Sequence, residues 1–309
     1  MTKKIALILS IYHIDLWNNF KDLLLPFKNN INLYLCLYKD NGPQKDIISS
    51  ADKLFNTRVS FHKNYGADIA PFLQILQLVE EPYFIKLHSK KSLLGDYKQI
   101  NWRNILLYDF LGSQDIFKKN YDTIVKTKCG AIGNKNLLLS NNEGYHSNKI
   151  KQLCNVLDIN YNNIKNYSFF GGSMFMSKTA LFKKHFLPYT NSLNELLSKE
   201  TKKVTEKPTG TFSHALERIF GYIISYNNLE FATVQHKTIK ILNSKAPNGL
   251  FNMITLHNND CYLQEDIHVY GQILNNSFDN FTIQWNHLQP NPVQKYQYLG
   301  ENTIIQKND

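Results

Sequence analysis

Apolar runs of strand length alternate along the chain with stretches whose apolar residues recur at helical spacing. The run KIALILSIY, Lys4–Tyr12, is continuous, and residues 15–27 follow it with helical spacing as far as Pro26. The run INLYLCLY, Ile31–Tyr38, has the length of a second strand. Strands that alternate with helices in this way predict a parallel sheet covered on both faces.

The alternation continues toward the C-terminus. Further strands are predicted over residues 57–64, 83–88 and 129–134, and further helices over residues 46–55, 70–79, 101–112, 113–127 and 212–226. Residues 167–184 predict two extended pieces around a glycine turn, followed by the start of a helix. Residues 192–211 are polar and rich in lysine and threonine, which predicts a mobile loop. Beyond residue 242 the sequence is rich in asparagine and has short extended pieces, so we expect one domain over residues 1–242 and a C-terminal extension over residues 243–309.

The composition is that of a folded, enzyme-sized protein with a basic surface. Of its 309 residues, 43% are hydrophobic and 13% aromatic, which excludes a disordered chain. The formal net charge of +10 favours an anionic partner such as a nucleotide, a phosphate, an anionic lipid or a nucleic acid. The cationic residues are scattered, and basic and aromatic residues are not interleaved on any predicted surface, so no nucleic-acid partner is expected.

The cysteines and the N-terminus indicate a reduced, cytoplasmic protein. The four cysteines, at positions 36, 129, 154 and 261, form neither a zinc spacing nor a disulfide pattern. Polar residues interrupt the first apolar run and no small-residue cleavage site follows, so the run predicts a strand and not a signal peptide. No run reaches the roughly 18 apolar residues of a membrane span, so we expect any membrane contact to be peripheral.

Polar residues and a glycine follow the third predicted strand, where a helix begins. In the stretch HKNYGADIAPF, Gly66 lets the backbone approach a ligand closely, and Asp68 can accept a hydrogen bond from a ribose or sugar hydroxyl. Ligands of open α/β sheets bind at this edge. The alternative is plain helix capping, in which Asp68 satisfies N–H groups of the first turn and Pro71 lies where its missing N–H costs nothing.

Cations lie inside and after the fourth predicted strand, in the stretch PYFIKLHSKKSLLGDYKQINWR. Lys86 and His88 share one face of the strand. A lysine is seldom buried without a partner, so Lys86 either pairs with a carboxylate, for which Asp68 is the candidate, or faces a ligand cleft. Lys90 and Lys91 follow in the loop, and Arg103 follows shortly after. Such a cluster suits a pyrophosphate leaving group, and the alternative is a solvated loop with one structural ion pair.

Two glycines and a small hydroxyl residue follow the extended piece before residue 171. In the stretch SFFGGSMFMSK, the residues Gly171, Gly172 and Ser173 allow the backbone to come near a ligand. An ordinary tight turn explains the same residues.

A helix with one polar stripe is predicted in the stretch TGTFSHALERIFGY. With Thr211 as N-cap, the residues His214, Glu217, Arg218 and Gly221 lie on one stripe, opposite a core stripe. A glutamate and a histidine three residues apart can take or relay the proton of a sugar hydroxyl. The alternative is a surface stripe with a local ion pair between Glu217 and Arg218.

These stretches, in this order, resemble the rhamnan synthesis protein F family of bacterial polysaccharide glycosyltransferases. The resemblance rests on SIYHIDLWNNFKDLL, NYGADIAPFL, KLHSKKS with the following WR and LLYDFLGS, FFGGSMFMSK and GTFSHALERIF. It covers about residues 5–226 and leaves the C-terminal extension outside.

The resemblance implies an α/β fold of the GT-A type, a single Rossmann-like domain with a mixed, mainly parallel sheet and the donor over the strand ends. It implies a cytoplasmic enzyme, peripheral at the inner face of the membrane, that moves a sugar from a nucleotide-sugar to a cell-surface polysaccharide such as capsule, O-antigen or a rhamnan. The acceptor is then a glycan or a lipid-linked glycan. The alternatives are transfer of another activated group, such as a polyol phosphate, and a non-catalytic subunit of glycan assembly.

The resemblance also suggests roles for the residues singled out above. Donor binding is expected of Asn64, Gly66 and Asp68, and Asp68 is also counted among the catalytic residues. Diphosphate binding is expected of Lys86, His88, Lys90, Lys91 and Arg103. Arg218 is expected either to contact the phosphate or to orient the general base. Acceptor binding is expected of Gly171, Gly172 and Ser173. Glu217 is expected to be the general base of an inverting reaction, with His214 as the second candidate; in a retaining reaction Glu217 positions donor or acceptor instead.

The sequence departs from the GT-A pattern at one point that concerns metals. Many GT-A enzymes hold a divalent metal with Asp-x-Asp at the end of the strand equivalent to residues 83–88, and this sequence has no Asp-x-Asp. Lys86, His88 and the lysines after them stand there instead, so we expect cationic side chains in place of a metal and no other cofactor. The nearest metal-like pair is Asp266 with His268 in the C-terminal extension.

Overall fold

The computed structural model describes most of the chain up to residue 234 and seven separate strands after it. The described residues are 4–89, 102–134, 137–141, 146–163, 167–200 and 211–234, with the later strands. The chain divides into two compact units, one of residues 1–89 and 110–234 and the other of residues 90–109 and 235–309. The expected domain boundary after residue 242 stays a prediction.

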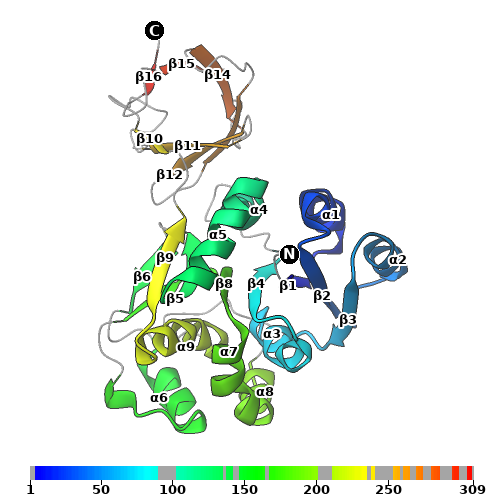
Figure 1. Ribbon diagram of the computed structural model, residues 1–309, viewed down its shortest axis with the longest axis vertical. Coiled ribbons are helices and arrows are strands. Elements are labelled where there is room, and N and C mark those ends of the chain that lie inside the picture. The colour runs from blue at the N-terminus through cyan, green and yellow to red at the C-terminus, as the bar shows by residue number, and fades with distance from the viewer. Residues whose placement is uncertain are drawn as a thin grey trace. The chain divides into compact units, whose positions relative to one another are not determined.

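A seven-stranded sheet in the order β3-β2-β1-β4-β8-β5-β9 forms the centre of the first unit (Figure 1). Its strands are β1 (Ile5–Ile11), β2 (Ile31–Tyr38), β3 (Thr57–His62), β4 (Tyr83–His88), β5 (Cys129–Asn134), β8 (Phe175–Lys178) and β9 (Glu230–Val234). β8 pairs antiparallel with β4 and with β5, and the other neighbours pair in parallel. This is the mixed, mainly parallel α/β sheet that the GT-A-like prediction requires, so the predicted fold class is confirmed. A small antiparallel pair, β6 (Leu138–Ser140) and β7 (Ser168–Phe170), accompanies it.

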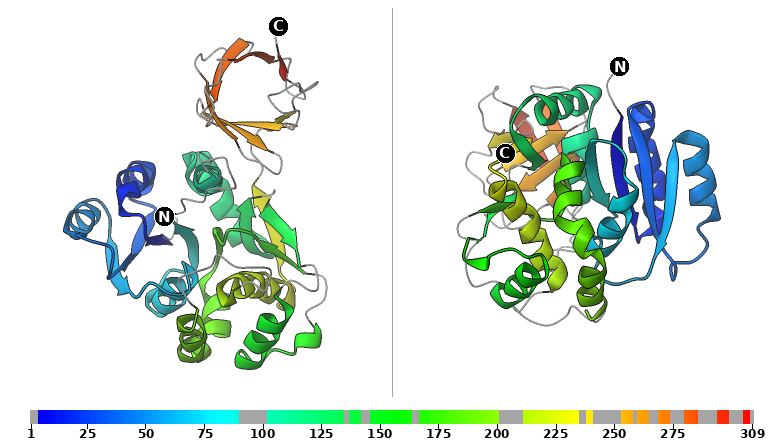
Figure 2. Two further views of the ribbon diagram at one scale, coloured as in Figure 1. Left: turned by 180° about the vertical axis from the view of Figure 1, so that it is seen from behind. Right: turned by 60° about the horizontal axis from the view of Figure 1, so that its bottom comes forward.

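Helices cover both faces of this sheet. They are α1 (Trp17–Leu24), α2 (Lys45–Leu54), α3 (Ile69–Ile75), α5 (Gln114–Lys126), α6 (Ser147–Val156), α7 (Thr179–Phe186), α8 (Thr190–Ser198) and α9 (Phe212–Tyr226). A further helix, α4 (Trp102–Leu111), belongs mostly to the second unit. Figures 1 and 2 show α1 and α2 on one side of β1 to β3 and α3 on the other. All seven residues of β1 are buried, as expected for a central strand that is covered twice. Ala6 and Ile8 point into the core shared with α3, α6, α7, α8 and α9.

The second unit contains an antiparallel sheet in which each strand pairs with the next one along the chain. The strands are β10 (Thr238–Lys240), β11 (Met253–His257), β12 (Asp260–Gln264), β13 (Val269–Ile273), β14 (Asn280–Trp285), β15 (Gln294–Tyr298) and β16 (Ile305–Lys307). The extended pieces expected in the C-terminal extension are therefore confirmed where the structure describes them.

The prediction of a mobile loop over residues 192–211 is wrong at its start. Residues Thr190–Ser198 form α8, because Leu193 and Leu197 lie four residues apart on one helical face and are fully buried. Two leucines are a weak signal within a polar segment, yet their burial is enough to fix the helix. Residues 201–210 lie outside the described residues.

Within the part of the chain that the structure describes, there is neither a membrane-spanning helix nor a disulfide. None of the described helices combines the length and the apolar character that a membrane crossing needs. Cys36, Cys129 and Cys154 are buried free thiols. The expected cytoplasmic location and the peripheral membrane contact stay predictions.

Candidate functional site

Asp68 stands between β3 and α3, at the carboxyl edge of the parallel strands. It occupies the N-cap position of α3, but its side chain makes no capping hydrogen bond to that helix. The carboxylate instead contacts the ammonium of Lys86, and Ser173 Oγ donates to its Oδ2 at 2.6 Å. The alternative that Asp68 is a plain helix cap is therefore wrong, because both partners come from distant parts of the chain.

Lys86 is the buried cation of β4, and its side chain is only 1% exposed. Its ammonium donates to Asp68 Oδ2, to the carbonyl oxygen of Ser173 at 3.0 Å and to Ser173 Oγ at 3.0 Å. Three acceptors match the three N–H donors of a lysine. Of the two alternatives for Lys86, the structure shows the pairing with Asp68. An ammonium that is turned inward in this way does not favour direct contact with a diphosphate.

His88 lies two residues further along β4, on the same face as Lys86. Its Nε2 is 2.9 Å from the carbonyl oxygen of Gly172, so this nitrogen carries the proton and donates. The same nitrogen is 3.9 Å from Asp68 Oδ1. Both polar side chains on this face of β4 therefore hold the turn at Gly172 and Ser173.

Two tight turns bring these groups together, and each contains a left-handed residue other than glycine. Gly66 and Ala67 have φ angles of 63° and 50°, and Gly172 and Ser173 have φ angles of 81° and 51°. A non-glycine residue in this region costs about 1–2 kcal/mol. Such backbone strain concentrates at functional sites, where the surrounding contacts hold it in place.

Replacing Gly66 by alanine is expected to lower the free energy of unfolding more than replacing Gly42 does. Both glycines are left-handed, with φ angles of 63° and 70°. A Cβ on Gly66 would lie 2.8 Å from Ala70 Cβ and 3.0 Å from Leu197 Cβ, whereas a Cβ on Gly42 would meet nothing closer than 3.9 Å. We expect losses of about 1–2 kcal/mol for Gly42→Ala and about 2–5 kcal/mol for Gly66→Ala, measured by urea unfolding. Equal losses would contradict the crowding at Gly66.

The groups around Asp68 keep its carboxylate ionised. Burial by itself raises the pKa of Asp68, but the positive charges of His88 and Lys86 and the hydrogen bonds from Lys86 and Ser173 outweigh it, so the pKa lies below its usual value. A carboxylate held as an anion accepts hydrogen bonds and is a poor proton carrier at neutral pH. The geometry therefore favours hydroxyl binding by Asp68 over proton transfer.

One exposed aromatic residue at this edge was not predicted from the sequence. Tyr12 directly follows β1, is 41% exposed, and packs edge-on against Tyr38 with ring centroids 5.3 Å apart. The hydroxyl of Tyr38 donates to the carbonyl oxygen of Ala67 at 3.0 Å, next to Asp68. Ser89 Oγ holds the segment by accepting the N–H of Tyr12 at 2.8 Å. The available signal was a tyrosine directly after a buried strand, at the edge where ligands bind.

His214, Glu217 and Arg218 lie in the first two turns of α9, as predicted. Arg218 Nη1 donates to the carbonyl oxygen of His214 at 3.0 Å, and the guanidinium lies 4.7 Å from the centroid of the Phe169 ring. The predicted polar stripe does not extend to Gly221, which is buried against β7. A Cβ on Gly221 would lie 2.1 Å from a backbone oxygen of that strand, so only glycine fits there.

The start of α9 is linked by contacts to the turn at Asp68. Leu197, near the end of α8, would lie 3.0 Å from a Cβ on Gly66. Shortly after α8, the carboxylate of Glu200 accepts the N–H of Ser213 in the first turn of α9, at 3.3 Å. Contacts through Leu197 and Glu200 therefore link the turn at Gly66 to the first turn of α9.

The other predicted site residues are placed in part. Asn64 is partly buried just before the turn at Gly66, and Gly171 is buried at the start of the second turn. Arg103 belongs to α4, and its side chain lies outside what the structure describes. Four more residues lie outside the described residues: Lys90, Lys91, Asp266 and His268. The roles expected of all of them stay predictions.

The described side chains at the end of β4 do not fit a metal ion. Among the residues that the structure describes, no group of three or more His, Cys, Asp or Glu side chains is arranged to hold one. The Asp68 carboxylate already contacts the ammonium of Lys86, and His88 Nε2 carries a proton. A divalent cation needs ligand atoms with free lone pairs, and a neighbouring ammonium repels it. Metal independence of the protein stays a prediction.

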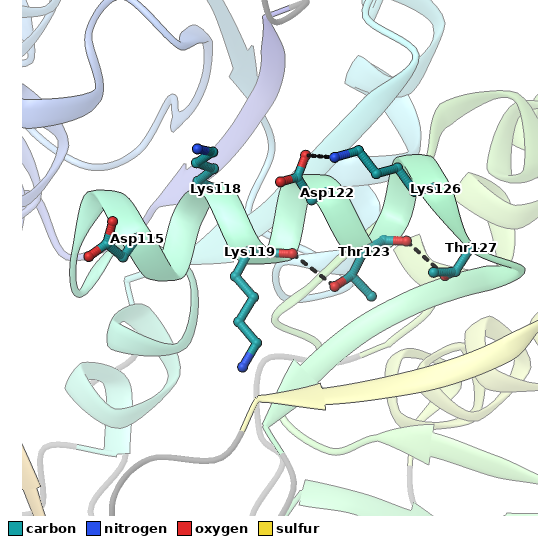
Figure 3. Close-up of a pocket in the computed structure, with 7 residues that line it drawn as sticks. All are labelled: Asp115, Lys118, Lys119, Asp122, Thr123, Lys126 and Thr127. Atoms are coloured by element: carbon teal, nitrogen blue, oxygen red, sulfur yellow. Dashed lines mark hydrogen bonds and ion pairs between the residues drawn. The ribbon is translucent and has the colours of Figure 1, made fainter.

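A hollow on the exposed face of α5 differs from the site at Asp68, because a single helix and its end line it (Figure 3). Cations and carboxylates alternate along its lining, which consists of Asp115, Lys118, Lys119, Asp122, Thr123, Lys126 and Thr127. Lys126 pairs with Asp122 at 3.0 Å, and the hydroxyls of Thr123 and Thr127 donate to carbonyl oxygens one turn earlier. These interactions stay within one helix and its end, so the hollow is a solvated helix surface.

Comparisons with known proteins give one matching family model and similar solved structures. The family model of rhamnan synthesis protein F, RgpF, matches residues 1–229. Two crystal structures of the glycosyltransferase GlyE from Streptococcus pneumoniae TIGR4 are similar, one with 12% identity and a TM-score of 0.38, the other, in the apo form, with 13% identity and a TM-score of 0.34. Each similarity covers 75% of this chain and 45% of the GlyE chain. This chain therefore spans less than half the length of GlyE. Among curated proteins, none matches it.

Proposed function

Because this chain belongs to the rhamnan synthesis protein F family, as its motifs predicted, we propose that it is a glycosyltransferase of polysaccharide synthesis. The donor in this proposal is a nucleotide-sugar, and the acceptor is a cell-surface glycan or its lipid-linked precursor. Cationic side chains take the place of a divalent metal at the donor diphosphate. The family supports the reaction class, and the contacts of Asp68, Lys86 and Ser173 support a binding site at the strand ends.

One observation carries the proposal. Asp68, Lys86 and Ser173 come from three distant segments and form one hydrogen-bonded group at the carboxyl edge of the sheet, and His88 donates to the carbonyl oxygen of Gly172 next to it. Ligands of α/β sheets bind at that edge. Ionisable groups whose charge is set by burial and by specific partners are typical of functional sites.

The donor side of the proposed site combines an aromatic ring with polar groups. Tyr12 stacks on the nucleobase, because an exposed tyrosine ring offers a face to any base. Asp68 accepts a hydrogen bond from a ribose or sugar hydroxyl, with Asn64 and Gly66 beside it. Lys86 is a positioning residue that holds Asp68 and the turn at Ser173. The diphosphate is assigned to His88, Lys90, Lys91, Arg103 and Arg218.

The acceptor side provides the proton acceptor. The turn of Gly171, Gly172 and Ser173 supports the acceptor glycan. Glu217, with His214 as the second candidate, removes the proton of an acceptor hydroxyl. The acceptor oxygen then forms a bond to the anomeric carbon, the bond from that carbon to the diphosphate oxygen breaks, and the nucleoside diphosphate leaves with the bonding electron pair. The configuration at the anomeric carbon is inverted.

The true donor is expected to raise the melting temperature of the protein, because a ligand that binds only the folded state stabilises it. The screen uses nucleotide-sugars of different bases and a nucleotide-activated polyol, followed by a transfer assay with a glycan acceptor.

Tyr12→Ala is expected to weaken donor binding by about 1–3 kcal/mol. The control Tyr226→Ala changes a tyrosine that is 55% exposed at the far end of α9 and should leave binding unchanged.

The results of this screen separate the alternatives. Stabilisation by nucleic acid and by no nucleotide-sugar would contradict the proposal. Donor binding without transfer would indicate a non-catalytic subunit, and transfer from the activated polyol alone would indicate the other transferase class.

Transfer is expected to continue at an unchanged rate in EDTA, because His88 and the other cations assigned to the diphosphate supply the positive charge that a metal would supply. EDTA saturated with calcium is the control for effects of the chelator itself. Activity that disappears in EDTA and returns with manganese would show that this expectation is wrong.

A further inference from the structure

The first turn of α9 has a hydrogen-bond partner for each of its leading N–H groups. A helix by itself leaves these groups without partners. In α9, Thr211 Oγ1 accepts the N–H of His214 at 3.1 Å, and the carboxylate of Glu200 accepts the N–H groups of Phe212 and Ser213. Since these donors are already taken, the start of α9 is not an open anion site, although helix N-termini often are.

Glu200 also holds this turn through a side chain. Its second carboxylate oxygen accepts a hydrogen bond from the hydroxyl of Ser213 at 2.7 Å, and Ser213 is only 8% exposed. Glu200 and Phe212 are 12 residues apart in sequence, so the contact is tertiary and not a local cap. A carboxylate is also attracted by the positive end of the helix dipole. The first turn is therefore fixed by a residue outside the helix.

On its other side, Glu200 is connected to the turn at Gly66. Its N–H donates to the carbonyl oxygen of Leu197 at 3.1 Å, which ties it to the end of α8. Leu197 is fully buried and would lie 3.0 Å from a Cβ on Gly66. Gln74 of α3 donates to Asn194 of α8 at 3.0 Å. The end of α8 thus joins the proposed donor-binding turn to the start of α9.

We infer that Glu200 is a positioning residue for the transfer reaction, one that holds His214 and Glu217 in place relative to the turn at Gly66. The hydroxyl of Thr211 lies 2.8 Å from His214 Nδ1, so a turn that frays moves the His214 side chain directly. Glu217 follows in the next turn of the same helix. The inference rests on the proposed function, which supplies the reaction that these residues serve.

Glu200→Ala is expected to lower kcat about tenfold or more, because a displacement of about 1 Å can cost 100-fold in rate. Donor affinity, measured by titration calorimetry, is expected to stay unchanged. Glu200→Gln keeps a carbonyl oxygen that can accept a hydrogen bond from the N–H groups of the helix. Its kcat is therefore expected to fall less than that of Glu200→Ala. The matched control is Glu195→Gln. Glu195 lies on α8, is exposed and pairs locally, with Lys199 at 2.7 Å. Neither kcat nor donor affinity should change in this control.

Amide hydrogen exchange tests the anchoring without the reaction. Glu200→Ala is expected to speed exchange at Ser213 and His214, but not in the second half of α9. If Glu200→Ala does not fold, Glu200→Gln is used for both measurements, with smaller changes in the same direction.

The outcomes distinguish this inference from the proposed function. A folded Glu200→Ala protein with the kcat of the wild type overturns the inference and leaves the proposed function intact. An equal fall in kcat and in donor affinity also overturns it, because that pattern indicates general damage to the fold. If the wild type transfers no activated sugar, the proposed function fails, and the positioning role fails with it whatever the exchange result.

Discussion

Glu217→Gln is expected to lower kcat by about 10²- to 10⁴-fold while nucleotide-sugar affinity stays unchanged. Glutamine keeps nearly the shape of glutamate but cannot take up a proton, so only proton transfer is lost. Glu217 is partly buried in the second turn of α9, next to Arg218 in sequence. Initial rates at saturating donor give kcat, and a separate titration gives donor affinity.

Two further variants make this test specific. Glu230→Gln makes the same charge change on an exposed residue of β9 and should leave kcat unchanged. His214→Ala tests the second candidate for the general base. A larger fall in kcat in His214→Ala than in Glu217→Gln would make His214 the base. Unchanged transfer in Glu217→Gln would remove Glu217 from that role. Retained configuration in the product would assign Glu217 to positioning of donor or acceptor.

Lys86→Met is expected to lower the free energy of unfolding by about 3–5 kcal/mol. Methionine has a similar length but no charge, so the variant leaves the Asp68 carboxylate, whose side chain is 16% exposed, without its cation. Ser173 also loses the ammonium that bonds both of its oxygens. Urea unfolding measures the loss, and transfer should fall as well because both turns lose their common anchor.

The double variant Lys86→Met with Asp68→Asn is the control for this effect. It removes both charges, so it is expected to be more stable than Lys86→Met alone. Losses that simply add up from the two single variants would mean that no coupling energy links Lys86 and Asp68. Such a result would contradict the ion pair as the anchor of the site.

The ion pair also determines how stability depends on pH. Burial raises the pKa of Asp68, but the charges and hydrogen bonds around it lower that pKa further, so the unfolded state binds the proton more readily than the folded state. The resulting stabilisation is present above the unfolded pKa of about 3.9 and is lost as the pH falls below it. The difference in unfolding free energy between wild type and Asp68→Asn should therefore shrink on acidification below about pH 4. A difference that stays constant would contradict the depressed pKa.

The secondary structure of the first unit could be predicted well because its signals are local. α9 runs over residues 212–226 as predicted, and α1 ends at Leu24, shortly before Pro26. Helical spacing, the N-cap threonine and the proline stop all act within a few residues of one another. α8 was missed because its residues are mostly polar, and only its burial against α3 and α9 makes it a helix. α6 and β9 were not predicted either.

The site could be predicted only in part. Asp68 was recognised as a possible partner of Lys86, but helix capping explained the same residue equally well. The two residues are 18 positions apart, and Lys86 and Ser173 are 87 positions apart. Local spacing does not determine such contacts. Tyr12 and Glu200 were missed for the same reason, because the importance of each depends on neighbours that are distant in sequence.

By itself, the sequence determined the family, the alternation of strands and helices, and the segments that carry polar and glycine residues at strand ends. These features depend on the order of residues within short stretches. The tertiary structure decided which of those residues meet. The parallel pairing of β1 with β4 and the antiparallel pairing of β4 with β8 place Lys86 beside the turn at Ser173, and α3 brings Asp68 to both. A buried ammonium must find its acceptors within reach, and only the order of the strands sets which acceptors those are.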